Sequence, residues 1–181
     1  MRYAVSVPNF EEFGDVRTVA ALAADAEAAG EVLTRLWSGE TVSFRGRHYR
    51  VDEVAFQPTP VQRPRIPIWV AGVWPNRGPL RRAARFDGVV PLKLGDDGEL
   101  VPLHADDLGE LLAVVRAHRA GGEPFEVMLG GETPGDDPAA ARAVVEPLAQ
   151  AGMTWWTESL EPRRGDLEEL RTRVRQGPPG R

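Results

Sequence analysis

The stretch IPIWVAGVWPNRGPLRRAARFDGVVPL, residues 66–92, decides the fold because it contains one complete strand–helix–strand unit. Its first part, IWVAG (68–72), is continuously apolar and runs into a glycine-containing loop, which predicts a buried strand. PLRRAARF (79–86) has a proline in its first turn and predicts a short helix. DGVVPL (87–92) predicts the next strand. Two apolar strands joined by a helix are typical of a parallel sheet covered by helices.

The same alternation extends along the chain in both directions. Apolar segments predict further strands at residues 2–8, 125–131 and 154–159, and helical periodicity predicts helices at about 106–120, 138–151 and 166–175. Two short β-rich runs around Arg45 and Gly46 predict a small hairpin, and the prolines that follow it predict an irregular loop. These patterns predict a single α/β domain over residues 1–175 and a flexible tail over 176–181.

The alternation breaks at Gly30. An alanine-rich helical pattern reaches this glycine from about residue 16, and a strand is due next. Instead, EVLTRLWSG (31–39) has a second helical pattern, whose apolar face would carry Val32, Leu33, Leu36 and Trp37. Because no turn cluster separates the halves, we expect a continuous or kinked helix over about 16–38; two abutting helices are the alternative.

The composition excludes several classes of chemistry. The chain has 181 residues, no cysteine and a net charge of −5. Disulfides, thiolate catalysis and cysteine-ligated metal are therefore excluded, and the negative charge argues against nucleic acid as a partner. Its three histidines lie far apart in the sequence, so we expect no metal site. Neither a signal peptide nor a membrane-spanning apolar run is visible, which predicts a cytoplasmic protein.

Candidate ligand-binding residues follow the strands, because ligands of parallel α/β folds bind at the carboxyl ends of the strands. The loop after residues 68–72 is the most informative. It offers Gly72 for close backbone approach and a group of arginines, namely Arg77, Arg81, Arg82 and Arg85. Backbone N–H groups and guanidinium forks are what a phosphate requires. The alternative is that these arginines form a solvated helix face.

Two other strand ends carry weaker signals. Gly130 and Gly131, followed by Glu132 and Thr133, form a second possible ligand loop or a glycine-rich strand exit. Glu158 ends the strand at 154–159 and could act as a base or hydrogen-bond acceptor, or pair with one of the arginines. Trp155 and Trp156 should point to opposite faces of that strand. No catalytic triad or carboxylate pair is evident, so no catalytic residue is assigned.

Several segments together resemble the bacterial luciferase-like monooxygenases, the flavin-dependent TIM-barrel oxidoreductases. MRYAVSVPNFEEFGD resembles the first βα unit of that family, and the strings LWSG, F-RG-HY and P-Q-P-IPIWV-G resemble its long helix, hairpin excursion and fifth strand. RRAARFDGVVP and GMTWWTES are also similar to the family. The resemblance covers the chain from Met1 to about Arg175.

The resemblance implies an incomplete TIM-type barrel. Set against the family, the chain passes from the first helix to the end of the fourth at about Gly30 and Glu31, without strands two, three and four. Five mostly parallel strands would remain, in the family order five, six, seven, eight and one, together with flanking helices and the small hairpin. An edge strand leaves backbone N–H and C=O groups unpaired, which is unfavourable. The resemblance therefore also implies a homodimer that covers the two edges.

The family's cofactors and binding residues carry over as expectations. The resemblance implies FMN, with the deazaflavin F420 or no cofactor as alternatives, and an unknown small organic substrate. The phosphate region would contain Gly72, Arg77, Arg81 and Arg82; Asn9 and Phe10 correspond to positions near the ring, and Glu158 is the remaining candidate. Two functions follow: a flavin-dependent monooxygenase or oxidoreductase with a site completed by dimerisation, or a non-catalytic flavin- or ligand-binding remnant.

Overall fold

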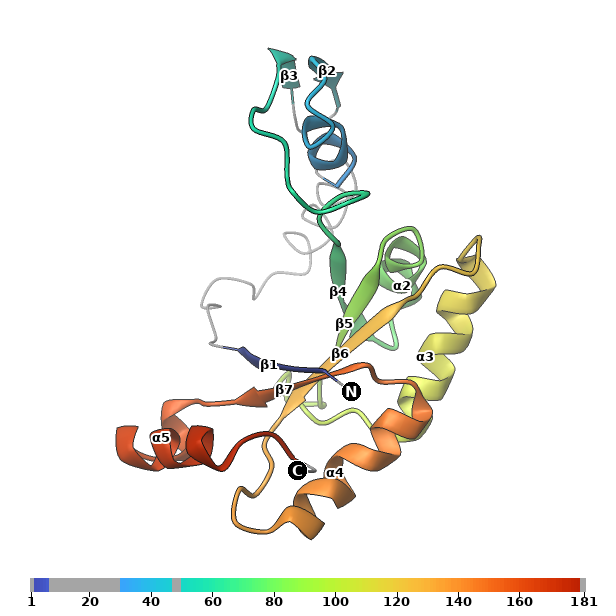
Figure 1. Ribbon diagram of the computed structural model, residues 1–181. Coiled ribbons are helices and arrows are strands. Elements are labelled where there is room, and N and C mark those ends of the chain that lie inside the picture. Colours follow the sequence, from blue (N-terminus) through green and yellow to red (C-terminus); the bar gives the residue numbers. More distant parts are fainter. Residues whose placement is uncertain (1, 7–29, 47–49, 180–181) are drawn as a thin grey trace. The chain divides into compact units, whose positions relative to one another are not determined.

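The structure, a computed structural model, consists of two compact units. The larger contains residues 1–9 and 69–181, and the smaller contains residues 10–68. Residues 2–6, 30–46 and 50–179 are described, with the side chains of 2–6 excluded (Figure 1). Among the described residues, no helix is both long and apolar enough to span a membrane.

A five-stranded parallel sheet forms the centre of the larger unit. Its strands are β1 (Arg2–Ser6), β4 (Trp69–Trp74), β5 (Gly88–Lys93), β6 (Glu126–Gly131) and β7 (Trp155–Ser159). The order β4-β5-β6-β7-β1 confirms the order that the family resemblance implied. β4 and β1 are the two edges of this sheet, and the sheet is open within the described residues.

Helices follow the strands as the periodicity predicted. They are α2 (Arg77–Ala83), α3 (Ala105–His118), α4 (Pro138–Ala151) and α5 (Leu167–Gln176), with a short 3-10 turn, η1 (Pro162–Arg164), before the last. The predicted bounds of α4 are met residue for residue, because Asp137 caps its first N–H groups and Gly152 ends it in a left-handed conformation. α2 begins two residues earlier than predicted, because the Asn76 side chain accepts a hydrogen bond from the Gly78 N–H.

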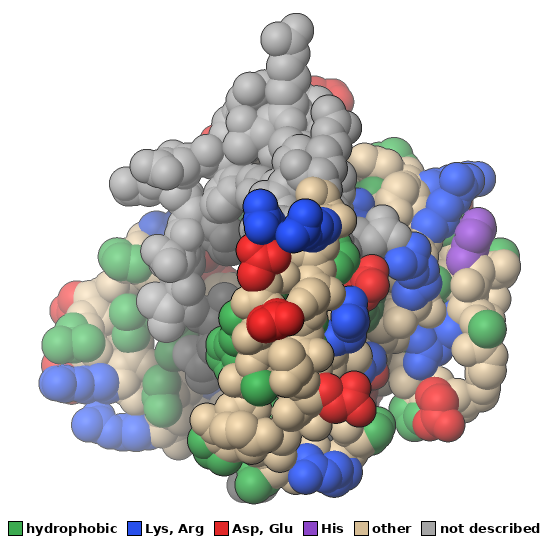
Figure 2. Space-filling view, turned by 90° about the horizontal axis from the view of Figure 1, so that it is seen from above, with side chains coloured by type: hydrophobic (Ala, Val, Ile, Leu, Met, Phe, Trp, Pro, Cys, Tyr) green, Lys and Arg blue, Asp and Glu red, His purple; other side chains and the backbone are tan. Residues whose placement is uncertain are grey.

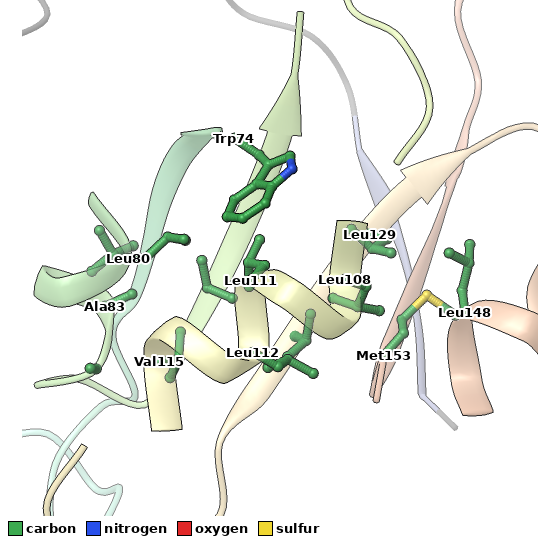
Figure 3. Close-up of a cluster of buried hydrophobic side chains, with 14 of the residues drawn as sticks. Trp74, Leu80, Ala83, Leu108, Leu111, Leu112, Val115, Leu129, Leu148 and Met153 are labelled. Atoms are coloured by element: carbon green, nitrogen blue, oxygen red, sulfur yellow. The ribbon is translucent and has the colours of Figure 1, made fainter. Parts of the chain in front are cut away.

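One face of the sheet packs against the helices. Most of the strand residues that point to this convex face are apolar, and they join buried residues of α2, α3 and α4 in one cluster (Figure 3). In α3 the buried stripe is Leu108, Leu111, Leu112 and Val115. The periodicity continues to His118, but His118 is exposed, with its Nδ1 at 2.9 Å from the Val114 carbonyl oxygen.

The other face of the sheet is concave. The rings of Trp69 in β4 and Trp155 in β7 meet edge to face at 5.4 Å between centroids, although β5 and β6 lie between their strands. In a flat sheet these strands would be about 14 Å apart. The sheet therefore curls as part of a barrel wall, and the two indoles close its amino-terminal end.

Gly88 of β5 makes room for this arrangement. A Cβ on Gly88 would lie 2.8 Å from the Trp69 ring and 2.6 Å from the Glu126 carbonyl oxygen. Trp155 in turn donates its indole N–H to the Glu126 carboxylate at 3.1 Å. Trp156 points to the opposite face and is buried in the convex core, as the alternation predicted.

The smaller unit contains a helical segment and a hairpin. Residues 30–36 are helical, which confirms the second half of the predicted long helix; residues 16–29 lie outside the described residues. β2 (Val42–Arg45) and β3 (Arg50–Val54) form the expected antiparallel hairpin. Val32, Leu36 and Val42 are buried in a small core, whereas Leu33, expected on the same helical face, is 41% exposed.

Gly72 is the point at which α2 approaches β4. A Cβ on Gly72 would lie only 2.5 Å from Cβ of Pro79, so only glycine allows the present packing. Gly109 on α3 is a natural control, because an added Cβ would meet nothing within 4 Å.

Gly72→Ala is therefore expected to destabilise the chain by about 1–3 kcal/mol, because the core is overpacked at this contact. Gly109→Ala should stabilise it by about 0.5–1 kcal/mol, since alanine is the better helix former. Urea unfolding followed by circular dichroism measures both. Equal stabilities of Gly72→Ala and the parent would show that α2 does not pack on β4 as described.

Candidate functional site

The carboxyl edge of the sheet brings together the ends of β4, β5, β6 and β7. Of the predicted site residues, Arg77 lies just beyond the end of β4 and Glu158 lies near the end of β7. Gly72 was expected in the loop after the strand, but β4 continues to Trp74, so Gly72 lies within the strand and faces Pro79 of α2. Arg81 and Arg82 lie in the last turn of α2, so their backbones are farther from the edge. Asn9 and Phe10 lie outside the described residues.

The start of α2 is a cationic part of this edge. Arg77 is the first helical residue and Arg81 follows one turn later, and both side chains are exposed. Residues at this spacing share a helix face, and helical side chains incline towards the amino terminus. Neither arginine has a carboxylate partner among the described residues, and α2 contains no acidic residue.

Arg82 differs from these two arginines. It is half-buried, and its Nε is fully buried without a hydrogen-bond partner among the described atoms. A buried N–H that lacks an acceptor costs free energy unless a ligand or solvent supplies one. α2 therefore combines two exposed guanidinium groups with one orphaned buried donor, an arrangement that suits an anionic ligand.

Below this edge, the side chains on the concave face of the sheet are almost all uncharged, and they form a surface called here the neutral wall. The strand residues that point to it are Trp69, Ala71, Val73, Gly88, Val90, Leu92, Glu126, Met128, Gly130, Trp155, Thr157 and Ser159. Glu126 is the one ionisable side chain among them, and it lies at the amino end beneath the tryptophans. Thr157 is only 2% exposed, and its Oγ1 lacks a partner among the described atoms.

Lys93 and Asp107 form an ion pair on the convex side of the same edge. Lys93 Nζ lies 2.8 Å from both oxygens of Asp107, and Asp107 also accepts the His104 backbone N–H. Burial would raise the pKa of Asp107, but the His104 N–H and the Lys93 ammonium lower it below its usual range. The sequence carries no local signal for this pair, because the two residues lie on separate elements.

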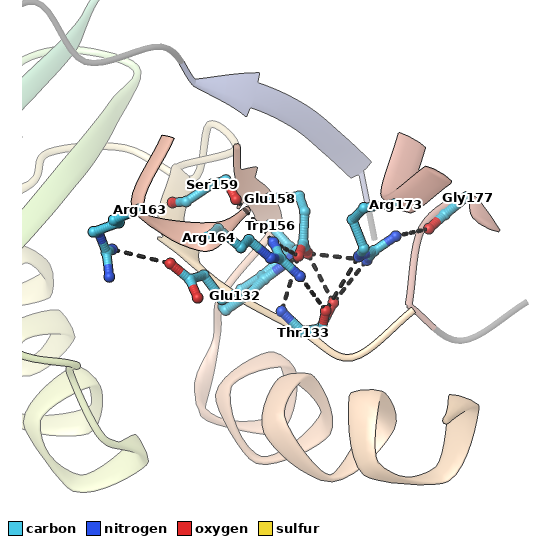
Figure 4. A network of polar contacts seen from close by, with 9 residues as sticks. All are labelled: Glu132, Thr133, Trp156, Glu158, Ser159, Arg163, Arg164, Arg173 and Gly177. Atoms are coloured by element: carbon cyan, nitrogen blue, oxygen red, sulfur yellow. Dashed lines mark hydrogen bonds and ion pairs between the residues drawn. The ribbon is translucent and has the colours of Figure 1, made fainter. Parts of the chain in front are cut away.

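Glu158 is the centre of a buried polar network on the convex side (Figure 4). Its carboxylate accepts hydrogen bonds from the Thr133 backbone N–H, the Thr133 hydroxyl and the Trp156 indole N–H, at 2.8–3.0 Å. Arg164 donates to it from η1, and Arg173 of α5 lies 3.2 Å away. This arrangement supports the alternative that paired Glu158 with arginines.

Arg173 extends the network to the end of the chain. It is 7% exposed, and it donates to the Thr133 carbonyl and hydroxyl oxygens and to the Gly177 carbonyl. Thr133 itself is 1% exposed. The sequence offered the β6–α4 loop as a second ligand loop. Its Thr133 is fixed by hydrogen bonds from Arg173 of α5.

The network determines how Glu158 titrates. Burial would raise the pKa of Glu158, but the hydrogen bonds from Thr133, Trp156 and Arg164 outweigh burial and hold it below its usual range. A carboxyl whose pKa is lower in the folded state stabilises the fold above its unfolded-state pKa. That contribution is lost as the pH falls through the folded-state value.

Glu158→Gln is expected to destabilise the chain by about 3 kcal/mol, because it leaves two buried guanidinium groups without their counter-charge. Its stability should also depend less on pH than that of the parent around and below pH 4.5, the ordinary pKa at which an unfolded-state glutamate is half protonated. Glu132→Gln is the matched control, because Glu132 pairs with the exposed Arg163 and its loss should cost far less than the loss of Glu158. Thermal melts from pH 3 to 7 test both, and equal losses in the two variants would contradict the assignment.

The described residues contain no group of three or more potential metal ligands. Acidic and basic side chains both occur across the face shown in Figure 2.

Comparison with known proteins adds to this geometry. The chain is 34% identical over 117 residues to an F420-dependent hydroxymycolic acid dehydrogenase of Mycobacterium tuberculosis (strain ATCC 25618 / H37Rv), a match that covers 62% of the chain and 29% of that protein. The chain therefore spans less than a third of that relative's length.

One solved structure shares the fold. An F420-dependent secondary alcohol dehydrogenase in complex with an F420-acetone adduct matches with a TM-score of 0.57 at 12% identity, over 82% of this chain and 59% of that one. The monooxygenase RslO1 from Streptomyces bottropensis matches with a TM-score of 0.43 at 20% identity, over 83% and 43%. The sequence pattern of the luciferase-like monooxygenases matches residues 5–181, so the chain belongs to the luciferase-like monooxygenase family.

Proposed function

We propose that the chain is a flavin-dependent oxidoreductase of the luciferase-like type, and that its cofactor is an F420-type deazaflavin, with FMN as the alternative. The observation that carries the proposal is the start of α2, where unpaired arginines stand at the carboxyl edge of the sheet. The F420-dependent enzymes named among the relatives support the choice of deazaflavin.

The described residues fit such a cofactor on physical grounds. Arg77 stands at the positive end of the α2 dipole, and Arg81 is a like charge one turn away; each placement is unfavourable by a few tenths of a kcal/mol or more. A bound phosphate would relieve both and could supply an acceptor for the orphaned Nε of Arg82. Arg77, Arg81 and Arg82 would thus hold the phosphate, while the neutral concave face would line the ring.

A bound deazaflavin would supply hydride transfer, which no side chain of the protein can perform. The chain's own contribution would be binding, orientation and exclusion of water. Val90 and Leu92 present apolar surface to the concave side, and Gly130 leaves space beside them. On the concave face of β4 to β7, no described side chain above the tryptophans could donate or accept a proton as an ionisable group.

That last feature favours a second candidate, a non-catalytic flavin- or ligand-binding member of the family. A protein that only binds a flavin needs the arginines and the neutral wall, but no general acid or base. The two candidates share the binding prediction and differ in turnover with a reduced cofactor.

The binding prediction concerns the two exposed arginines. Addition of F420 to the protein should perturb the cofactor's absorption and fluorescence and raise the melting temperature. Arg77→Gln/Arg81→Gln should weaken binding at least about tenfold, because each guanidinium–phosphate contact is worth over about 1 kcal/mol. The same titration with FMN tests the alternative cofactor.

Arg116→Gln is the control for this titration, because Arg116 is also an exposed helical arginine but lies in the last turn of α3. It should bind F420 as the parent does. Absence of micromolar binding of either cofactor would contradict both candidate functions.

We further propose that the chain is a homodimer. β1 and β4 are each paired on one side only in the described sheet, and an unpaired strand edge attracts another chain. Multi-angle light scattering should therefore give about twice the 19.8 kDa of one chain. A monomer with a cooperative melt would contradict this proposal.

A further inference from the structure

The last helix, α5, carries a charged residue inward and its apolar residues outward. Arg173 is 7% exposed and donates to the Thr133 carbonyl oxygen, whereas Leu167 is 64% exposed and Val174 58%. A surface helix normally buries its apolar face and exposes its charges. α3 packs against α2 and α4, and α5 stands apart from these three helices (Figure 1). The apolar face of α5 is therefore turned away from the buried cluster of the larger unit.

An open groove of about 420 Å³ lies on this face of α5. Its lining consists of four apolar and two basic residues, namely Leu160, Leu167, Leu170, Val174, Arg171 and Arg175. Leu167, Leu170 and Val174 follow one another at intervals of three and four residues, which places them in one row along the helix. Contiguous exposed apolar side chains of this kind mark a surface that binds another molecule.

A row of charged residues lies beside this apolar row. Glu168, Arg171 and Arg175 repeat the same intervals one residue further along, so they share one flank of the helix. The Glu168 carboxylate lies 2.6 Å from Nη1 of Arg171 and 3.9 Å from Nη1 of Arg175. The charged row is thus acidic at the amino end of α5 and basic at its carboxyl end.

This distribution of charge complements a second copy of the same helix. When two identical helices pack antiparallel about a two-fold axis, each flank faces the same flank of the other helix, running in the opposite direction. The acidic end of one charged row then meets the basic end of the other, while the apolar rows face each other. Parallel packing would instead bring like charges to the same level, and charge complementarity fixes the orientation of an interface.

We infer that α5 is a dimerisation helix, which packs antiparallel against α5 of a second copy of this chain. Leu167 of one copy lies against Val174 of the other. Glu168 of one copy pairs with Arg175 of the other, and Arg171 keeps its partner within its own helix. The inference rests on the homodimer proposed above, and it adds a contact surface that the strand edges do not indicate.

Sedimentation velocity over a series of protein concentrations tests the apolar part of this contact. Leu167→Asn/Val174→Asn should weaken dimerisation at least about a hundredfold, because each lost apolar contact occurs twice in a symmetric interface. Val144→Asn is the matched control, because Val144 is also an exposed apolar residue, at 41%, but lies on α4. This control should dimerise as the parent does.

The charged row is tested by reversal and exchange. Glu168→Arg should weaken dimerisation about tenfold, because it places like charges opposite each other twice in the dimer. The exchange Glu168→Arg/Arg175→Glu should restore dimerisation, because opposite charges meet again in the antiparallel pair. A covering partner other than α5 itself would not follow the exchange, so failure to restore the dimer would overturn the inference.

Thermal melts of the apolar variant at several protein concentrations complete the test. The parent's melting temperature should rise with concentration more steeply than that of Leu167→Asn/Val174→Asn. A loss of melting temperature that is equal at every concentration would show that another part of the same chain covers the apolar row. That result, or undiminished dimerisation of the apolar variant, would contradict the assignment of α5.

The two proposals fail in different ways. A monomeric parent contradicts the homodimer and, with it, the α5 contact. A dimeric parent that the α5 variants leave intact supports a homodimer through another surface and contradicts the α5 contact alone. The cofactor proposal depends on neither result, because the F420 titration tests it separately.

Discussion

The contact between Trp69 and Trp155 determines how the rest of the larger unit is built. Because the two rings meet across two intervening strands, the sheet must curl, and its two faces cease to be equivalent. The helices pack on the convex face, where the strands contribute Val70, Val89 and Val127. The concave face carries none of these helices, and the two indoles close its amino-terminal end.

Charges are distributed according to the same division. The buried ion pairs, Lys93 with Asp107 and Glu158 with Arg164 and Arg173, all lie on the convex side, where they join helices to the strand ends. On the concave side of β4 to β7, Glu126 beneath the tryptophans is the one ionisable side chain described. A site of this kind gains affinity from apolar contact and from a few fixed polar groups around its rim.

Local signals account for what could be predicted from the sequence. The strand order followed from the family resemblance, and α4 was bounded correctly because Asp137 and Gly152 act within their own helix. Arg173 could not be anticipated, because a charged residue on a short helix normally faces solvent. Its burial depends on Thr133, forty positions earlier.

The network around Glu158 also has a consequence for the order in which the chain can fold during synthesis. Thr133 and Glu158 leave the ribosome before Arg164 and Arg173, the residues that neutralise the carboxylate. Until α5 has been made, the carboxylate lacks its counter-charges and burial is opposed. The strands of the sheet can pair earlier. The β6–α4 loop, in contrast, should take up its final packing only after α5 has been made.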